Sequence, residues 1–326
     1  MLHLYLFIRD ESNRFGLFVD DQNIDGMYPA TLLPRKILIE GNKKVIDIAS
    51  GSHHFLMLTQ DGQVYSMGEG SKGQLGRIGA DDLESLSSKR ELFIKPSAIR
   101  FPSSEVVSQI FARQWCSFAL TEEGHLYAWG LNNNNQLGFR TSNPIQFDHN
   151  ASLNGVATLM AELYPVRVPM PSNAGQVVAI SNGQQHVAIV DIDGRIFTCG
   201  NSTYGKLGHG QEFVAKCGDE QCIEKWKQID PAMFDNDRIT FIECGDFSTF
   251  AITETGRLYA WGQGSKGIGT DEGQGQDLFV PTLIDSDAYG RNNLVFFTGA
   301  GSSLFSGWIG TFQHHQQQTI KEQQKQ

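Results

Sequence analysis

The 326-residue sequence is poor in basic residues, in cysteine and in long apolar runs. Its net charge of −10 argues against non-specific nucleic-acid binding, because neutralising phosphates requires clustered Lys and Arg. Its five cysteines form no Cys-x-x-Cys pair, which argues against zinc, and an odd number without a secretion signal favours a reducing compartment. No apolar run reaches transmembrane length, and the opening MLHLYLF is too short for a signal-peptide core. We therefore predict no membrane association and no bound metal.

Glycine, in contrast, is abundant and follows a repeat. The stretch Thr59 to Gly76 (TQDGQVYSMGEGSKGQLG) returns at 121–138, at 191–208 and, one residue shorter, at 253–269. In each copy a turn glycine precedes a second glycine by six residues. The turn glycines are spaced 62, 70 and 62 residues apart: Gly62, Gly124, Gly194 and Gly256. A fixed period of this length indicates a repeat architecture.

Each copy predicts a β-hairpin preceded by one more strand. The turn glycine supplies the left-handed conformation that a tight hairpin turn requires. Short runs rich in apolar, β-branched and aromatic residues flank it. The predicted strands are 45–49, 55–58 and 64–65; 106–111, 118–120 and 126–127; 177–180, 187–190 and 196–197; and 239–242, 250–252 and 258–259. Several strands and a variable connector per repeat predict an all-β fold in which each repeat is one blade of a β-propeller.

The repeats fill most of the chain. We predict a propeller domain over 1–312 and a disordered Gln-rich tail over 313–326. Complete repeats are expected near 45–78, 105–138, 176–210 and 238–270, with a partial repeat near 294–309. The connectors are read as a charged surface loop (79–104), a polar segment (139–175) and a segment with a short helix around Glu220–Lys227.

Several motifs that suggest chemistry are explained by the repeat. The stretches 68–73 and 262–267 match Gly-x-Gly-x-x-Gly, and Gly200 to Lys206 is close to a P-loop, but no helical pattern follows them to bind phosphate. No Ser-His-Asp, Cys-His or paired-carboxylate arrangement stands out. His53, His54 and His186 follow the first strand of their repeats, and by themselves they indicate packing and hydrogen bonding within the blade. We predict no cofactor, no small-molecule substrate and no covalent catalysis.

With these repeats the sequence resembles the regulator of chromosome condensation repeat family, whose members form a seven-bladed propeller. Three segments are similar to the branch of that family that releases guanine nucleotides from the small GTPase Ran: Ile8–Leu17 (IRDESNRFGL), Gly73–Arg77 (GQLGR) and Ser181–His186 (SNGQQH). About four complete blades are present with partial ones. The resemblance therefore implies an N-terminally truncated propeller that lacks about two blades and a basic N-terminal tail.

The resemblance also implies a mechanism and a set of contact residues. A β-wedge and one propeller face would stabilise the nucleotide-free GTPase, so that GDP leaves. At the wedge positions the chain has Arg9, Asp10, Glu11, Ser12 and Asn13, of which Arg9 and Asp10 match the family and the rest diverge. At the face positions it has His53, Arg77, Asn133, Gln185 and His186. The family has Asp where this chain has His53, and His where it has Gln185. The implied partners are Ran and also histones or chromatin, and the implied location is the nucleus.

Two other readings remain open. The departures at His53 and Gln185 favour a non-catalytic scaffold that binds another protein or chromatin through the same face. A propeller enzyme would need a perturbed titratable cluster, which the sequence does not indicate.

Overall fold

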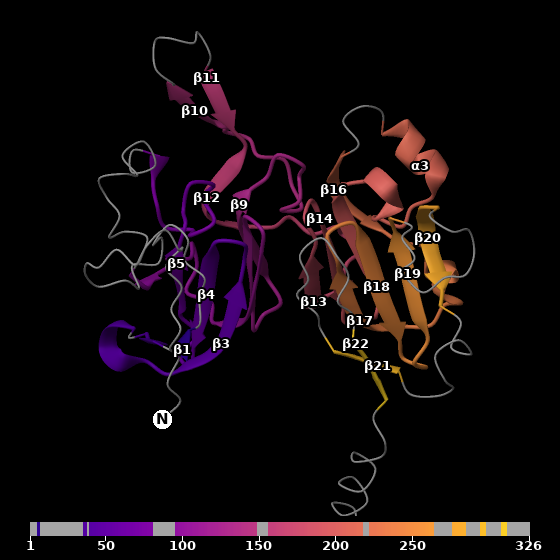
Figure 1. The fold of residues 1–326 in the computed structure, drawn as a ribbon, viewed down its shortest axis with the longest axis horizontal. Coiled ribbons are helices and arrows are strands. Elements are labelled where there is room, and N and C mark those ends of the chain that lie inside the picture. Colours follow the sequence, from indigo (N-terminus) through magenta and orange to yellow (C-terminus); the bar gives the residue numbers. More distant parts are fainter. Residues whose placement is uncertain are drawn as a thin grey trace, which may run out of the picture. The chain divides into compact units, whose positions relative to one another are not determined.

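The computed structural model describes residues 5–6, 35–37, 39–80, 95–148, 156–217, 222–263, 276–284, 294–297 and 308–311. Four antiparallel sheets of four strands each dominate this part of the chain (Figure 1). Each sheet contains the three predicted strands of one repeat, and this confirms the all-β fold. The remaining sheets are two-stranded.

The three predicted strands of every blade are present, and each runs somewhat further than predicted. They are β3 (Val45–Ser50), β4 (His54–Thr59) and β5 (Val64–Gly68); β7 (Val107–Arg113), β8 (Cys116–Thr121) and β9 (Leu126–Leu131); β13 (Val177–Asn182), β14 (His186–Asp191) and β15 (Ile196–Asn201); and β17 (Ile239–Cys244), β18 (Ser248–Thr253) and β19 (Leu258–Gly262). The hairpin turns contain the predicted glycines, and Gly62 has a φ of 74°. Only glycine adopts this conformation without strain, which confirms the turn prediction.

A fourth strand completes each sheet, in stretches that the sequence analysis reads as connectors. These strands are β6 (Ser97–Ala98), β12 (Ala161–Arg167), β16 (Cys222–Gln228) and β20 (Leu278–Leu283). The helix predicted around Glu220–Lys227 is therefore wrong. In β16 a buried Trp226 stands between exposed Lys225 and Lys227, and this two-residue alternation is that of a strand. The helix in this connector is instead α3 (Gln211–Lys216).

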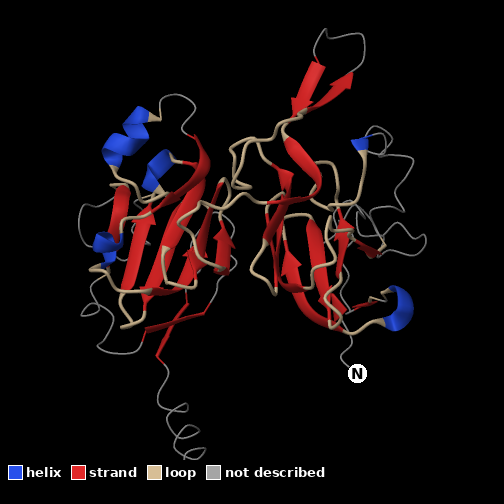
Figure 2. Cartoon of the chain, turned by 180° about the vertical axis from the view of Figure 1, so that it is seen from behind, coloured by secondary structure: helices blue, strands red, loops and turns tan. Residues whose placement is uncertain are grey.

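Smaller elements surround the blades. β1 (Tyr5–Leu6) pairs with β2 (Arg35–Lys36), β10 (Ile145–Asp148) with β11 (Val156–Leu159), and β21 (Leu294–Phe297) with β22 (Trp308–Thr311). The short helical segments are η1 (Glu40–Asn42), η2 (Thr203–Gly205) and η4 (Pro231–Phe234), and Figure 2 shows how little of the described chain is helical. No described helix has the length and apolar character needed to cross a membrane. The predicted tail, 313–326, lies outside the described residues.

The chain divides into two compact units. Unit 1 comprises residues 1–178 and 222–227, and unit 2 comprises 179–221 and 228–326. The blade β3–β6 and the blade β7–β9 with β12 lie in unit 1. The blade β17–β20 lies in unit 2, together with β14 and β15 of the third blade.

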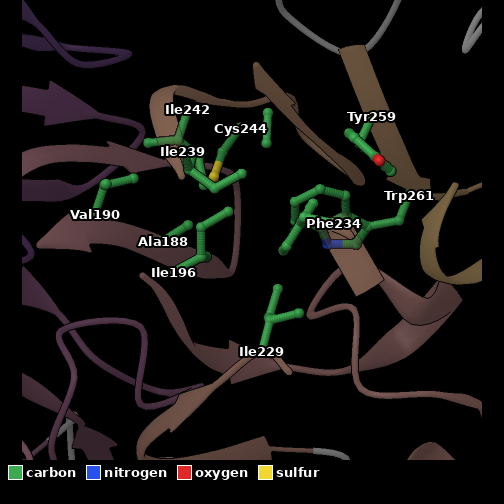
Figure 3. Close-up of a cluster of buried hydrophobic side chains, with 11 residues drawn as sticks. Ala188, Val190, Ile196, Ile229, Phe234, Ile239, Ile242, Cys244, Tyr259 and Trp261 are labelled. Atoms are coloured by element: carbon green, nitrogen blue, oxygen red, sulfur yellow. The ribbon is translucent and has the colours of Figure 1, made fainter. Parts of the chain in front are cut away.

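Each unit has its own apolar core, in which facing blades bury one another's side chains. In unit 1 the core includes Leu56, Leu58, Ile110, Ala119 and Trp129. In unit 2 it includes Val190, Ile196, Ile242, Tyr259 and Trp261 (Figure 3). Phe234 of η4 packs edge-on against Tyr259, with ring centroids 5.1 Å apart. A fully buried side chain of this size contributes about 1.5–3 kcal/mol, so these contacts between blades stabilise each unit.

Candidate partner-binding surface

One position recurs at the same end of every blade, between the first and second strands. Its backbone carbonyl accepts a hydrogen bond from the residue that directly follows the second glycine of the repeat. The four bonds are Glu69 N to His53 O, Leu131 N to Trp115 O, Asn201 N to Gln185 O, and Gln263 N to Phe247 O. We call His53, Trp115, Gln185 and Phe247 the corner residues. His53 is therefore equivalent to Gln185, whereas His54 is equivalent to His186.

The corner residues make ring contacts within each unit. In unit 1 the rings of His53 and Trp115 have centroids 4.9 Å apart and are tilted by 40°. In unit 2 the ring of Phe247 meets Tyr204 edge-on, with centroids 5.6 Å apart. Lys206 Nζ lies 5.6 Å from the centroid of the Phe247 ring, which adds a cation–π contact. Each unit thus presents an aromatic pair at this end of its blades.

Tyr204 has a backbone conformation that aromatic residues rarely adopt. Its φ is 61°, and its side chain is 41% exposed. Left-handed backbone costs a non-glycine residue about 1–2 kcal/mol. The equivalent residues Lys72 and Asn134 do not have a positive φ. Such strain is concentrated at binding sites, so Tyr204 is a candidate contact residue that the sequence analysis missed.

Asn133 lies in the exposed turn that follows the third strand of the second blade. Its Oδ1 atom accepts hydrogen bonds from Gln136 Nε2 at 3.2 Å and from Asn134 Nδ2 at 3.1 Å. These bonds fix the orientation of the amide. The turn begins next to the corner, because Leu131 N–H donates to the Trp115 carbonyl at 3.0 Å. His53, Trp115 and Asn133 therefore belong to one end of unit 1.

Arg77 is held inside its own blade. Its Nε donates to Ser66 Oγ at 2.9 Å, and its Nη2 donates to the carbonyls of Ser66 and Lys95 at 3.3 and 3.4 Å. Burial lowers the pKa of Arg77 to about 10, so the side chain stays cationic at neutral pH. In the third blade, His209 Nε2 lies 2.9 Å from Thr198 Oγ1 in the same arrangement. The position therefore stabilises the blade in both units.

His186 is fully buried, and its Nε2 lies 2.9 Å from Thr249 Oγ1. Its neighbour Gln185, in contrast, is partly exposed. The predicted wedge residues Arg9, Asp10, Glu11, Ser12 and Asn13 lie outside the described residues. The structure thus groups His53 with Asn133 in unit 1, places Gln185 in unit 2, and turns Arg77 and His186 inward.

The aromatic corner residues Trp115 and Phe247 were not selected from the sequence. The signal was available, because aligning the repeats places both at the position of His53 and Gln185. The Gly-x-Gly-x-x-Gly stretch at 68–73 is followed by turns and bends over 74–77 and does not lead directly into a helix, as its place in the repeat predicts. Among the described residues, no three His, Cys, Asp or Glu side chains are grouped so as to hold a metal ion.

Blades of this kind, each with a turn glycine, a corner and a second glycine, define a protein built from β-propeller repeats. The chain belongs to the RCC1-like domain family, whose model matches residues 3–305. The human Regulator of chromosome condensation is 27% identical over 281 residues, which cover 82% of this chain and 58% of the relative. The guanine nucleotide exchange factor SRM1 of Saccharomyces cerevisiae is 25% identical over 313 residues, which cover 93% of this chain and 60% of the relative.

Solved structures show the same fold. Human WBSCR16 superposes with a TM-score of 0.61 at 21% identity, covering 84% of this chain and 61% of that one. Yeast RCC1 (Prp20), solved bound to Kap60, gives a TM-score of 0.61 at 22% identity, covering 78% and 52%. The fold is therefore the RCC1-type β-propeller. The chain spans about 60% of the length of the curated relatives it matches.

Proposed function

We propose that this chain is a guanine-nucleotide exchange factor for a small GTPase of the Ran type, and that it acts by binding without covalent chemistry. The family match supports an exchange role, since SRM1 is named as an exchange factor. Yeast Prp20p has been described together with its binding to Gsp1p and to histones. A net charge of −10 suits a partner with a basic surface.

The observation that carries the proposal is the contrast between the buried side and the outer side of the region around the corner residues. The buried side is filled by hydrogen-bonded groups such as His186, whereas the outer side presents Asn133 and the aromatic pairs. Aromatic residues and polar groups with fixed orientation are the usual anchors of protein interfaces. The expected contact set is His53, Trp115 and Asn133 in unit 1, Gln185, Tyr204 and Phe247 in unit 2, and the wedge residues Arg9 to Asn13.

Exchange by such a surface is a matter of linked equilibria. The chain must bind the nucleotide-free GTPase more tightly than the GDP-bound form, and the difference in binding free energy is what drives GDP out. The wedge would press on the phosphate-binding region of the GTPase. The corner residues would supply binding energy that remains after the nucleotide has left.

The test is release of a fluorescent GDP analogue from Ran. The protein should accelerate release, and His53→Ala and Asn133→Ala should each reduce the acceleration about tenfold, as expected for interface anchors. Gln60→Ala is the matched control, because Gln60 is exposed at the hairpin end of the first blade. With this variant, the GDP analogue should leave Ran as fast as it does with the wild type. A folded protein that leaves GDP release unchanged would refute the proposal.

A second candidate is a binding scaffold that uses the same surface without exchange, with histones or chromatin as partner. The inward hydrogen bonds of Arg77 favour it, because they remove one implied contact from the surface. Nucleosome co-sedimentation in the absence of GDP release would support this function. In both cases we propose a nuclear location.

A further inference from the structure

A buried hydrogen-bond network occurs twice in the chain with the same sequence spacing. His54 Nε2 lies 2.7 Å from Ser117 Oγ, and His186 Nε2 lies 2.9 Å from Thr249 Oγ1, and the partners are 63 residues apart in both cases. Ser117 Oγ donates to the Gln74 carbonyl at 2.9 Å, and Thr249 Oγ1 donates to the Lys206 carbonyl at 2.9 Å, 43 residues apart in both cases.

A tryptophan completes each network. Trp129 Nε1 donates to the Gln74 carbonyl and Trp261 Nε1 to the Lys206 carbonyl, both at 3.0 Å and both across 55 residues. The His, Ser or Thr, and Trp side chains of both networks are fully buried. We call each network a histidine clip.

The hydrogen bonds fix the chemistry of each clip. A hydroxyl has one proton, and here the proton goes to the backbone carbonyl. The hydroxyl oxygen must therefore accept from Nε2–H of the histidine, so the imidazole is protonated on Nε2. Loss of the hydroxyl would leave a buried N–H without an acceptor.

Each clip joins two consecutive blades. In unit 1 the histidine comes from β4 and the carbonyl from the turn after β5, while Ser117 and Trp129 come from β8 and β9 of the next blade. In unit 2 the histidine comes from β14, and its partners come from β18 and β19. The clip thus adds directional bonds to an apolar blade-to-blade contact.

The clip residues alternate along the chain. The first and third blades have the histidine, but they have Phe55 and Val187 at the hydroxyl position and Met67 and Cys199 at the tryptophan position. The second and fourth blades have the hydroxyl and the tryptophan, but they have Cys116 and Ser248 at the histidine position. The second and third blades therefore lack the groups for a clip with each other.

The second blade shows the difference directly. The glycine that ends its repeat, Gly138, is covered by Trp226, as Gly76 is by Trp129. Trp226 Nε1 is buried and, among the described residues, has no hydrogen-bond partner. The residues of the first clip all lie in unit 1 and those of the second clip all lie in unit 2, whereas β16 of the third blade, with Trp226, belongs to unit 1. We propose that the chain is built from two clip-locked pairs of blades, and that each pair opens and closes as a separate cooperative unit.

The test is hydrogen exchange of the full chain, followed by mass spectrometry of peptides from 45–131 and from 186–262. Ser117→Ala should raise exchange about tenfold or more throughout the first pair and leave the second unchanged. Thr249→Val, which keeps the side-chain shape, should do the reverse. Ser117→Thr and Thr249→Ser keep the hydroxyl, and they should exchange as the wild type does.

Ser66→Ala and Thr198→Val are matched controls. Both hydroxyls are fully buried and donate to a carbonyl of their own blade, at 2.7 and 2.9 Å. They should raise exchange in that blade without opening its neighbour. The proposal is overturned if either clip variant raises exchange in both pairs, or if its effect stays within one strand.

Discussion

Trp226 lies directly over Gly138, so that a Cβ atom on this glycine would lie 2.6 Å from the indole ring. The same relationship holds for Gly76 with Trp129 and for Gly208 with Trp261. Trp129 and Trp261 come from the third strand of the next blade, whereas Trp226 comes from a fourth strand. Three blades therefore meet one packing requirement, a ring over a glycine, by two structural routes.

Gly138→Ala should destabilise the protein strongly. The residue has a φ of 90° and faces Trp226, so backbone strain and overpacking act together. We expect a loss of about 2–5 kcal/mol in the free energy of unfolding, measured by chemical denaturation. Gly41→Ala is the matched control in unit 1, because Gly41 has a φ of 74° and its nearest neighbouring atom is 3.9 Å away. Equal losses for the two variants would contradict the packing account.

Acidification should weaken unit 1 through His54. Burial, with a smaller effect from His53, lowers the pKa of His54 to about 3 from its ordinary value of 6.5. Between these two values the unfolded state binds the proton and the folded state does not. Stability is therefore full above pH 6.5 and falls as the pH drops towards 3, by up to about 1.4 kcal/mol per pH unit.

His54→Gln separates this effect from other titrations. Glutamine keeps a donor for Ser117 Oγ and does not titrate. Denaturant unfolding between pH 7 and pH 4 should show a shallower loss of stability for the variant. Parallel curves for variant and wild type would refute the assignment to His54.

Arg77→Lys should lower the stability of the protein and have little effect on the nucleotide exchange that the folded protein promotes. Lysine keeps the charge, but it cannot reproduce the fork that reaches Ser66 Oγ and the two carbonyls. We expect a loss of about 1–3 kcal/mol in denaturant unfolding. GDP release, compared at equal concentrations of folded protein, should match the wild type. A large loss of release with unchanged stability would mean that Arg77 contacts the partner.

Tyr204→Asn should show the opposite pattern. Asparagine tolerates the left-handed backbone, so the strain at φ 61° is reduced while the contact with Phe247 is lost. The free energy of unfolding should change by less than about 1 kcal/mol, and the variant should accelerate GDP release from Ran less than the wild type does. Gln60→Ala, at the exposed hairpin end of the first blade, is the control. If Tyr204→Asn and the control both accelerate GDP release from Ran as strongly as the wild type, Tyr204 is not a contact residue.

The repeat register was readable from the sequence because a few positions have only one physical solution. Gly62 and its equivalents mark turns that need a left-handed residue, and the flanking apolar runs mark the strands. Fourth strands were not readable in this way. β6 has only two residues, and β16 mixes charged and apolar residues in a way that predicts a short helix. Only packing in three dimensions selects these segments as strands.

The candidate surface stays a prediction. His53 and Asn133 lie at one end of unit 1, whereas Arg77 and His186 face inward because they bond to Ser66 and Thr249, partners that the sequence does not reveal. Thr249 is 63 residues from His186, and no single repeat shows that relationship. Tyr204 depends on a backbone angle that the residue type disfavours, so sequence preference pointed away from it.

The link between the third and fourth strands differs in content from blade to blade. In the second blade it holds the β10–β11 hairpin, and in the third it holds α3, yet each sheet keeps its four strands in order. Such a link is a natural site for insertion, because chain can be added there without disturbing the inner strands. Epitopes, reporter domains or new recognition loops are best grafted between residues 139 and 160 or between 209 and 221.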